Sequence, residues 1–441
     1  MSFDIDKQTI EELNLLGKFR QGSVFGLFNK VKTGGGEQLL NEMFNHPLER
    51  VSAINMRSAI FRFFEGLQPV FPFDVPQVAL MRDYLDSKTG KSTLGSLAGL
   101  LKNKWLAILI RDERYKKTIQ GLQATIVTLN RCYDFLDGIK GSPGPYSIRV
   151  KQILSILSEK RLEQLRGLDI YRELPVKKLA FFDHLLKGSL HNEMREVIDF
   201  IYELDVNIAV SSVSKEKGFT YANALPADVN ILSAAGLSHP CLNGAVGNSI
   251  HLNQNSNLIF LTGANMAGKS TLMKTVGIGL YLAHMGFPIA AEHMEFSIRD
   301  GMYSSINVAD NIDLGYSHFY AEVIRVKQAA EATASGKRLL LMFDELFKGT
   351  NVKDAYDGTL AVTEAFAAYD DCLFIVSTHI IEVGEALQSN PDIQFVYMPT
   401  IMQELTPTYT YKLREGITED RQGMMIIRNE GILDLLAVKN N

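Results

Sequence analysis

The spacing of apolar residues divides the chain into two regions. Up to about residue 230, apolar positions recur three and four residues apart, which is the pattern of helices. Residues 38–44 follow this pattern and end at His46-Pro47, where proline stops a helix. Residues 194–210 place Val197, Ile201 and Leu204 along one side of a long helix. Gly34-Gly35-Gly36 is expected to be a flexible entry to the helix over 38–44.

Beyond residue 230 the pattern changes. Apolar runs of strand length occur at 258–261, 339–343, 373–376 and 395–398, with helical segments between them. Strand–helix alternation predicts a parallel sheet flanked by helices. We therefore expect a helical region over 1–230 followed by an α/β domain over 231–441.

The first strand of this domain runs into a glycine-rich loop and then a helix. Gly263, Gly268, Lys269, Ser270 and Thr271 have the G-x-x-x-x-G-K-S/T spacing of a P-loop. The glycines let backbone amides curl around phosphate oxygens, and the helix N-terminus adds partial positive charge. Lys269 is expected to reach the β/γ-phosphates, and the Ser270 hydroxyl to ligate Mg²⁺. The expected nucleotide-binding residues are Gly263, Ala264, Asn265, Met266, Ala267, Gly268, Lys269, Ser270 and Thr271.

Two carboxylates follow the strand over 339–343. Asp344 is placed to hold Mg²⁺ through its water shell, and Glu345 to orient or deprotonate an attacking water. An Asp-Glu pair on a solvated loop is common, but a buried strand downstream of a P-loop favours the catalytic interpretation. The strand over 373–376 ends in Ser377-Thr378-His379, and His379 is the histidine expected to contact the γ-phosphate.

Residues 310–322 lie between the P-loop and the Asp-Glu strand. Gly315 and Ser317 precede a helix expected to run through Glu322. A serine at this position is usually an N-cap. It can also offer its hydroxyl and nearby amides to a nucleotide bound by a second copy of the chain. The residues alone leave both interpretations open.

The charge of the chain is uneven. Its 441 residues carry a net charge of −5, which provides no overall attraction for nucleic acid. Residues 101–190, however, hold 17 Lys/Arg and 9 Asp/Glu, a net of +8, and the remainder is therefore at −13. Such a basic segment could follow a phosphate backbone, or it could be a solvated lysine-rich helical face.

Composition indicates the cellular compartment of the protein. The three cysteines, Cys132, Cys241 and Cys372, are far apart, which indicates a reducing compartment and no cysteine-based metal site. The first residues show no basic and apolar signal-peptide pattern. The apolar stretch over 275–291 is broken by His284 and Pro288, so a buried core helix is expected there rather than a membrane span. A cytoplasmic location is the resulting expectation.

These motifs together resemble the MutS family of DNA mismatch repair ATPases, a branch of the ABC-type ATPases. The family's loop is typically T-G-P-N-M-G-G-K-S-T, and residues 262–271 read T-G-A-N-M-A-G-K-S-T. The other matching segments are the Gly315/Ser317/Phe319/Glu322 pattern, Asp344-Glu345, Gly349-Thr350, Thr378-His379 and His239-Pro240. Residues 23–33, 39–48 and 203–206 resemble parts of the family's helical core.

The resemblance implies a helical core and lever domain followed by a P-loop NTPase domain of ABC type. It implies a homodimer with composite ATP sites, in which Lys269, Glu345 and His379 act on the nucleotide held by their own chain. Ser270 and Asp344 would hold Mg²⁺, and Ser317 would cap the γ-phosphate of the partner chain's ATP. ATP-driven opening and closing would then grip or release DNA, with a further repair protein as a possible partner and no membrane.

The sequence also departs from the family pattern. The family's N-terminal mismatch-reading and connector domains are expected to be absent, and residues 70–190 are short for a DNA clamp. The family's aromatic adenine platform follows His-Pro, where this chain has Ala245-Val246-Gly247, so adenine is expected to pack more weakly on Val246. Leu314, Tyr316 and His318 replace the usual signature residues.

Two functions remain open at this point. The first is a MutS-like ATPase that couples ATP binding and hydrolysis to dimer closure and DNA binding in repair or recombination, without classical mismatch reading. The second is an ATP-gated protein-interaction module with no direct DNA role. An ABC-type transport ATPase fits less well, because the L-S-G-G-Q signature is absent and Asn265-Met266 is not its pattern.

Overall fold

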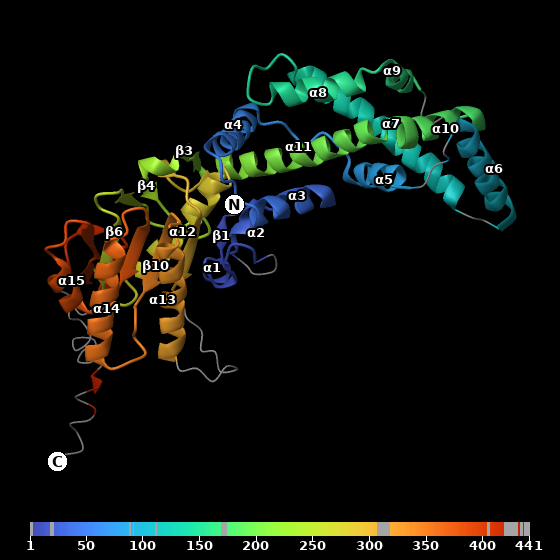
Figure 1. The fold of residues 1–441 in the computed structure, drawn as a ribbon. Helices are drawn as coiled ribbons and strands as arrows, with labels where there is room; N and C mark the ends of the chain where they lie inside the picture. Colours follow the sequence, from blue (N-terminus) through green and yellow to red (C-terminus); the bar gives the residue numbers. More distant parts are fainter. Residues whose placement is uncertain are drawn as a thin grey trace. The chain divides into compact units, whose positions relative to one another are not determined.

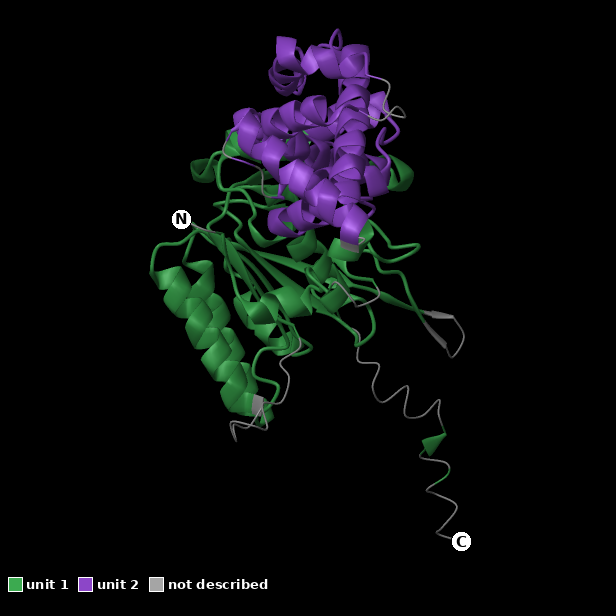
Figure 2. Ribbon diagram, turned by 90° about the vertical axis from the view of Figure 1, so that its right-hand side faces the viewer, with its two compact units in different colours: residues 1–27, 44–58, 214–441 green, residues 28–43, 59–213 purple. Residues whose placement is uncertain are grey.

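The computed structural model describes residues 3–17, 22–87, 90, 92–110, 113–168, 174–306, 318–403, 406–418, 431–432 and 435. The chain forms two compact units (Figure 2). Unit 1 contains residues 1–27, 44–58 and 214–441, and unit 2 contains residues 28–43 and 59–213. Each unit is assembled from separated segments of the chain. The domain division at residues 230/231 stays a prediction.

Unit 2 is helical throughout its described part (Figure 1). Its helices, of which α3, α4 and α11 also extend into unit 1, are α3 Gly34–Asn45, α4 Val51–Leu67, α5 Val75–Leu85, α6 Thr93–Ile110, α7 Arg114–Ile139, α8 Ser147–Leu157, α9 Lys160–Arg166, α10 Val176–His184, the π-helical turn Leu185–Ser189 and α11 His191–Lys217. The long helix predicted over 194–210 is confirmed as part of α11. Its Val197, Ile201 and Leu204 are fully buried in the core of the unit.

The three glycines before residue 38 form the first turn of α3, so the predicted flexible entry is wrong. Each of the last two glycines lies against a side chain of α11. A Cβ on Gly35 would come within 2.1 Å of the Tyr202 ring, and one on Gly36 within 2.6 Å of Asp205 Oδ2. The glycines therefore allow close packing of two helices, and this contact was not visible from local sequence.

Asp205 holds the start of α3. Its carboxylate accepts hydrogen bonds from the backbone N–H of Lys32 at 3.0 Å, and from the N–H and hydroxyl of Thr33 at 2.7 Å each. Asp205 and Thr33 are both buried, so the two Thr33 donors have no access to water there. A buried carboxylate that accepts several charge-assisted bonds stabilises the fold strongly.

We expect Asp205→Ala to lower the free energy of unfolding by about 3 kcal/mol, because it leaves buried donors without an acceptor. The measurement is urea denaturation followed by circular dichroism. Asp199→Ala is the matched control, since Asp199 is an exposed acid on the same helix. A loss for Asp205→Ala no larger than that of the control would contradict this assignment.

Unit 1 is built on a seven-stranded sheet with the order β1-β9-β10-β11-β6-β12-β15. All adjacent pairs are parallel except β12 with β15. The strands are β1 Asp4–Ile5, β6 Leu258–Gly263, β9 Gly301–Ser305, β10 Leu339–Asp344, β11 Leu373–Ser377, β12 Ile393–Met398 and β15 Arg414–Glu415. The four predicted strands are confirmed as β6, β10, β11 and β12, and their nearly continuous apolar runs fit a parallel sheet covered on both faces.

Smaller sheets and helices complete unit 1. The remaining strands are β2 Thr220–Tyr221, β3 Asn223–Leu225, β4 Leu232–Leu237, β5 Asn248–Leu252, β7 Pro288–Ile289, β8 His293–Ser297, β13 Thr400–Gln403 and β14 Thr406–Tyr409. The helices are α1 Lys7–Glu12, α2 Val24–Phe28, α12 Lys269–His284, α13 His318–Ala334, α14 Val352–Ala367 and α15 Ile381–Leu387, with a 3-10 turn at Ala227–Val229. The buried core helix predicted over 275–291 is confirmed for residues 275–284, which belong to α12, but residues 288–289 form strand β7.

The N-terminal segment belongs to the sheet of unit 1. Strand β1 pairs with β9, and Asp6 caps α1 by accepting from Thr9 N at 2.9 Å. The Asp6 carboxylate also pairs with buried Arg325 of α13, whose Nε donates to the Ser304 carbonyl at 3.0 Å. Burial alone would raise the pKa of Asp6, but hydrogen bonds from Arg325 and Thr9 outweigh it and hold the pKa below its usual value. The segment thus ties β9 to α13.

The structure agrees with a helical part followed by a mixed α/β part. No helix in the described part of the chain is long and apolar enough to cross a membrane.

Candidate nucleotide site

The glycine-rich loop joins β6 to α12 at the carboxyl edge of the sheet. Gly263 has a φ of +142° and Gly268 a φ of +105°, conformations that residues with a Cβ rarely adopt. A Cβ on Gly268 would also lie 3.0 Å from the Tyr411 ring. Helix α12 then begins at Lys269, so its free N–H groups face the loop. This arrangement of backbone donors and helix N-terminus is suited to phosphate.

Lys269 is buried inside the loop. Its Nζ donates to the carbonyls of Gly263 at 2.8 Å and Ala264 at 3.3 Å. Burial lowers the pKa of Lys269, and the nearby carboxylates of Glu345 and Asp344 partly offset that effect. The ammonium is thus positioned within the loop rather than in solvent.

Asp344 lies at the end of β10, next to the start of α12. The Ser270 hydroxyl donates to one oxygen of its carboxylate, and the Ser377 hydroxyl, from the end of β11, donates to the other. A hydroxyl and a carboxylate that meet beside a phosphate-binding loop are oxygen ligands that suit Mg²⁺, which keeps several waters and uses few protein groups. The donor set therefore fits the ion. No cluster of three or more His, Cys, Asp or Glu suited to a metal occurs among the described residues.

Glu345 follows Asp344 in a strained backbone conformation. Its φ is +56°, and its N–H donates to the Ser377 carbonyl at 2.9 Å. A left-handed residue other than glycine costs about 1–3 kcal/mol, and such residues cluster at functional sites. The Glu345 carboxylate lies 3.9 Å from His379 Nδ1 and 3.9 Å from Lys348 Nζ. The ends of β10 and β11 thus bring Glu345 and His379 together.

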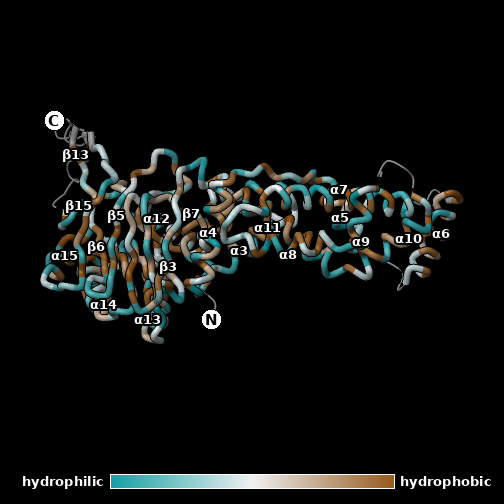
Figure 3. The backbone as a smooth tube through the Cα atoms, turned by 90° about the horizontal axis from the view of Figure 1, so that it is seen from above, coloured by the Kyte–Doolittle hydropathy of each residue, from teal (hydrophilic) through white to brown (hydrophobic). Residues whose placement is uncertain are grey.

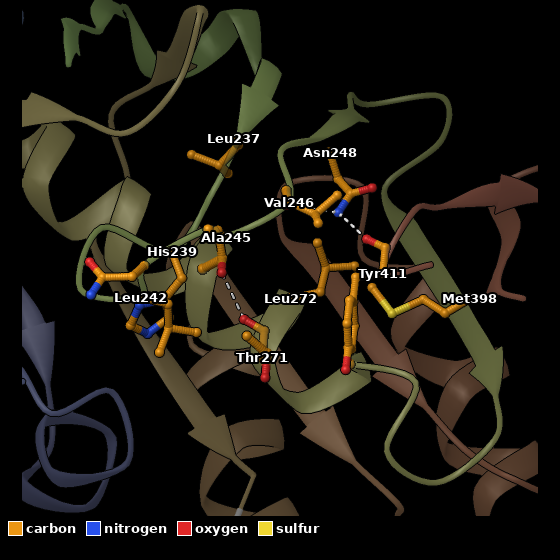
Figure 4. Close-up of a pocket in the computed structure, with 14 residues that line it drawn as sticks. Leu237, His239, Leu242, Ala245, Val246, Asn248, Thr271, Leu272, Met398 and Tyr411 are labelled. Atoms are coloured by element: carbon orange, nitrogen blue, oxygen red, sulfur yellow. Dashed lines mark hydrogen bonds between the residues drawn. The ribbon is translucent and has the colours of Figure 1, made fainter. Parts of the chain in front are cut away.

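An apolar cavity of about 330 Å³ lies beside the first turn of α12 (Figure 4). Residues on one side, His239 and Leu242, follow β4, and Gly268, Thr271 and Leu272 come from the loop and α12. Val246, predicted to contact adenine, also lines this cavity. Burial lowers the pKa of His239, helped by Lys274, which favours a neutral ring. A cavity next to a phosphate-binding loop is placed to receive the base of a nucleotide.

Tyr411 supplies an aromatic ring to this cavity, which the sequence did not indicate (Figure 4). It lies beyond the β13–β14 hairpin, far along the chain from Val246. The Asn248 side chain holds this segment, because its Nδ2 donates to the Tyr411 carbonyl at 2.9 Å and its Oδ1 accepts from Leu413 N at 2.8 Å. The sequence around Tyr411 shows only a tyrosine in a polar stretch, and this signal is too weak to assign a role to the residue.

Of the remaining predicted residues, those of the loop are described by the structure and Ser317 is not. Asn265, Met266 and Ala267 lie in the loop, where Met266 has a φ of +70° and an exposed side chain. Ser317 lies outside the described residues, so its predicted contact with a second chain stays a prediction. Its helix, α13, begins at His318, and Phe319 at that start packs against Gly349 and Phe347 of the loop after β10.

Comparison with known proteins agrees with this geometry. Residues 259–436 match the family model for MutS domain V, which includes the loop, Asp344-Glu345, His379 and Tyr411. Over these residues the chain matches the MutS family. The matched range carries the loop and the two carboxylates, whereas His239, Leu242 and Val246 of the cavity wall precede it.

Several MutS-family relatives align with more of the chain. DNA mismatch repair protein MSH6 of Arabidopsis thaliana is 27% identical over 68% of this chain and 24% of its own length. DNA mismatch repair protein MutS of Geobacillus kaustophilus is 26% identical over 83% of this chain and 42% of its own length. DNA mismatch repair protein MSH3 of Candida glabrata is 24% identical over 67% of this chain and 30% of its own length. The chain thus spans less than half the length of these relatives.

Proposed function

We propose that this chain is a Mg²⁺-dependent ATPase of the P-loop, ABC-type class that uses ATP binding and hydrolysis to control an assembly of two copies on DNA. The observation that carries the ATPase proposal is the joint position of Lys269, Asp344 and Glu345 around one loop, with a base-sized cavity beside it. Cavities of this size typically bind small molecules through apolar walls and a few polar groups.

The proposed binding mode follows from the order of groups along the site. The triphosphate lies on the loop over 263–271, where backbone amides, the α12 N-terminus and Lys269 neutralise its charge. The adenine enters the cavity between Val246 and Tyr411. Ser270 and Asp344 would hold Mg²⁺, which supplies charge neutralisation to the β- and γ-phosphate oxygens.

Glu345 is the proposed general base. Its carboxylate, held beyond β10, orients the attacking water and accepts its proton. His379, at 3.9 Å from this carboxylate and largely exposed, is proposed to contact the γ-phosphate and keep Glu345 oriented. Ser317 of a second copy is proposed to cap the γ-phosphate, which would make ATP binding and dimer closure interdependent.

Tyr411→Ala should weaken ATP binding about tenfold, because stacking of a base on an aromatic ring contributes ~1–3 kcal/mol. The measurement is equilibrium titration with Mg·ATP. Tyr409→Ala is the matched control, since Tyr409 lies next to Tyr411, with ring centroids 6.3 Å apart, but does not line the cavity. Equal affinities for the two variants would show that Tyr411 does not contact the base.

The DNA part of the proposal rests on the MutS-family relatives and on the basic segment over 101–190. The test is an anisotropy titration of duplex, mismatched and branched DNA at ~50 mM salt, with and without ATP. Phosphate contacts are strongest at low salt. We expect binding that ATP changes, whereas no binding to any of these DNAs would remove this part of the proposal.

A second candidate function is an ATP-gated protein-interaction module without a DNA role. Large apolar side chains exposed on one helix of unit 2 favour it. ATP-dependent capture of a protein partner, together with failure of the DNA titration, would support this alternative.

A further inference from the structure

Helix α6 of unit 2 has an exposed apolar stripe. Figure 3 shows apolar residues, in brown, along the backbone of α6. Leu94, Leu101, Trp105 and Ile108 are 78%, 42%, 64% and 68% exposed, and Ala98 is also exposed. These five residues, hereafter the α6 seam, are separated by four, three, four and three positions. This is the a/d spacing of a coiled-coil helix over two heptads.

The opposite face of α6 is covered. Leu100 is buried in the core of unit 2, Leu97 packs against that core, and Ser96 is buried. Ala98 and Trp105 take a positions of the heptad, and Leu94, Leu101 and Ile108 take d positions. Buried Ser96 and Leu100 then take the f and c positions, which normally face solvent. The helix is therefore apolar on both sides, and in the described part of unit 2 only one side has a partner.

Lysines flank the α6 seam. Lys102 and Lys104 occupy the e and g positions on either side of Leu101 and Trp105, and α6 contains no acidic residue. Residues at e and g decide which helix a coiled-coil seam accepts. A second copy with its seam in register would place lysines against lysines, which opposes self-pairing. The charges instead complement a helix with acidic flanks.

We propose that the α6 seam is a docking surface for an amphipathic helix of a partner protein, with an apolar heptad stripe and Glu or Asp at its flanking positions. Exposed apolar stripes of this kind mark interaction sites. The aliphatic side chains at 94, 101 and 108 offer nothing to phosphate or stacked bases, so nucleic acid fits this surface poorly. The seam is independent of the ATP site, and the inference does not rest on the proposed ATPase.

Trp105 provides a direct readout, because it is the only tryptophan of the chain. The probe is a synthetic three-heptad peptide with Ile at a, Leu at d and Glu at e and g, free of Trp and Tyr. Glutamates on both flanks keep this peptide from pairing with itself. Titrated into the full chain, it should shift Trp105 emission to the blue in a saturable manner, with a Kd of about 10 μM for so small a contact.

Charge reversal separates specific docking from adventitious adhesion. The double variant Lys102→Glu/Lys104→Glu should lose at least tenfold in affinity for the Glu peptide and bind the corresponding Lys peptide instead. Ile108→Glu, which leaves Trp105 in place, should abolish binding. Ile148→Glu, at an isolated exposed residue of α8 in the same unit, should change nothing.

Four results would overturn the proposal. The first is equal binding of the Glu and Lys peptides, and the second is no Trp105 response up to ~100 μM peptide. The third is a blue shift that depends on protein concentration alone. The fourth is a blue shift produced by phosphatidylglycerol vesicles or duplex DNA but not by the Glu peptide. The third result would identify a second copy as the occupant, and the last a lipid surface or nucleic acid. Lys102, Ile108 and Ile148 are exposed, whereas Lys104 is half-buried with its Nζ 5.8 Å from the centroid of the Tyr115 ring. Circular dichroism verifies that all variants fold.

Discussion

Glu345→Gln is expected to lower ATP turnover by at least about 10²-fold while ATP binding persists. A positioned general base contributes ~10²–10⁴-fold, and glutamine cannot accept the proton of the attacking water. The substitution keeps the shape of the side chain and removes its charge. The measurement pairs steady-state phosphate release with an equilibrium titration of Mg·ATP.

The strained backbone at Glu345 supplies a second argument for this expectation. A φ of +56° is retained only where the surrounding structure requires it, and here the Glu345 N–H is held by the Ser377 carbonyl at 2.9 Å. Lys348→Gln is the matched control. Lys348 Nζ lies 3.9 Å from the Glu345 carboxylate, as His379 Nδ1 does, but Lys348 lies outside the loop over 263–271. Normal hydrolysis by Glu345→Gln would show that another group acts as the base.

Lys269→Ala is expected to lower ATP turnover by about 10²-fold or more, and also to weaken ATP binding. Removing one preorganised charged donor from a phosphoryl-transfer site costs on this scale. Loss of binding distinguishes this variant from Glu345→Gln, which should retain it. The measurement is the same pair of assays, with turnover and affinity reported separately.

The control for Lys269→Ala is Lys274→Ala, which removes a lysine from the same helix, one turn beyond the loop. Lys269 is buried against the loop carbonyls, so its loss could also loosen the loop itself. Thermal unfolding without nucleotide measures that effect. Wild-type affinity and turnover in Lys269→Ala would remove the lysine from the proposed mechanism.

The positions of the loop and of the two carboxylates could be predicted because their signals are local. Residues 258–271 carry strand, glycines, lysine and helix in one continuous stretch, and Asp344-Glu345 directly follow a buried strand. Parallel strands place their carboxyl ends on one edge, so the three segments meet without further information.

The features that sequence did not predict depend on contacts between distant segments. Tyr411 reaches the cavity only because Asn248 holds the segment around it, and neither residue has a recognisable motif. Strand β1, at Asp4–Ile5, joins the sheet by pairing with β9, at Gly301–Ser305, which lies far along the chain. Gly35 is required by the ring of Tyr202 on α11, so a pattern typical of a flexible turn became the first turn of a helix.

In the proposed arrangement, one ATP binds each chain with its phosphates on the loop over 263–271 and its base in the cavity beside Tyr411. Calorimetric titration of Mg·ATP into the Glu345→Gln chain tests it most directly, with Lys269→Ala and Tyr411→Ala each added to that background. The account predicts saturable binding of one nucleotide per chain, weakened about tenfold or more by either added substitution. Saturable binding that neither substitution changes, or no binding at millimolar ATP, would contradict it.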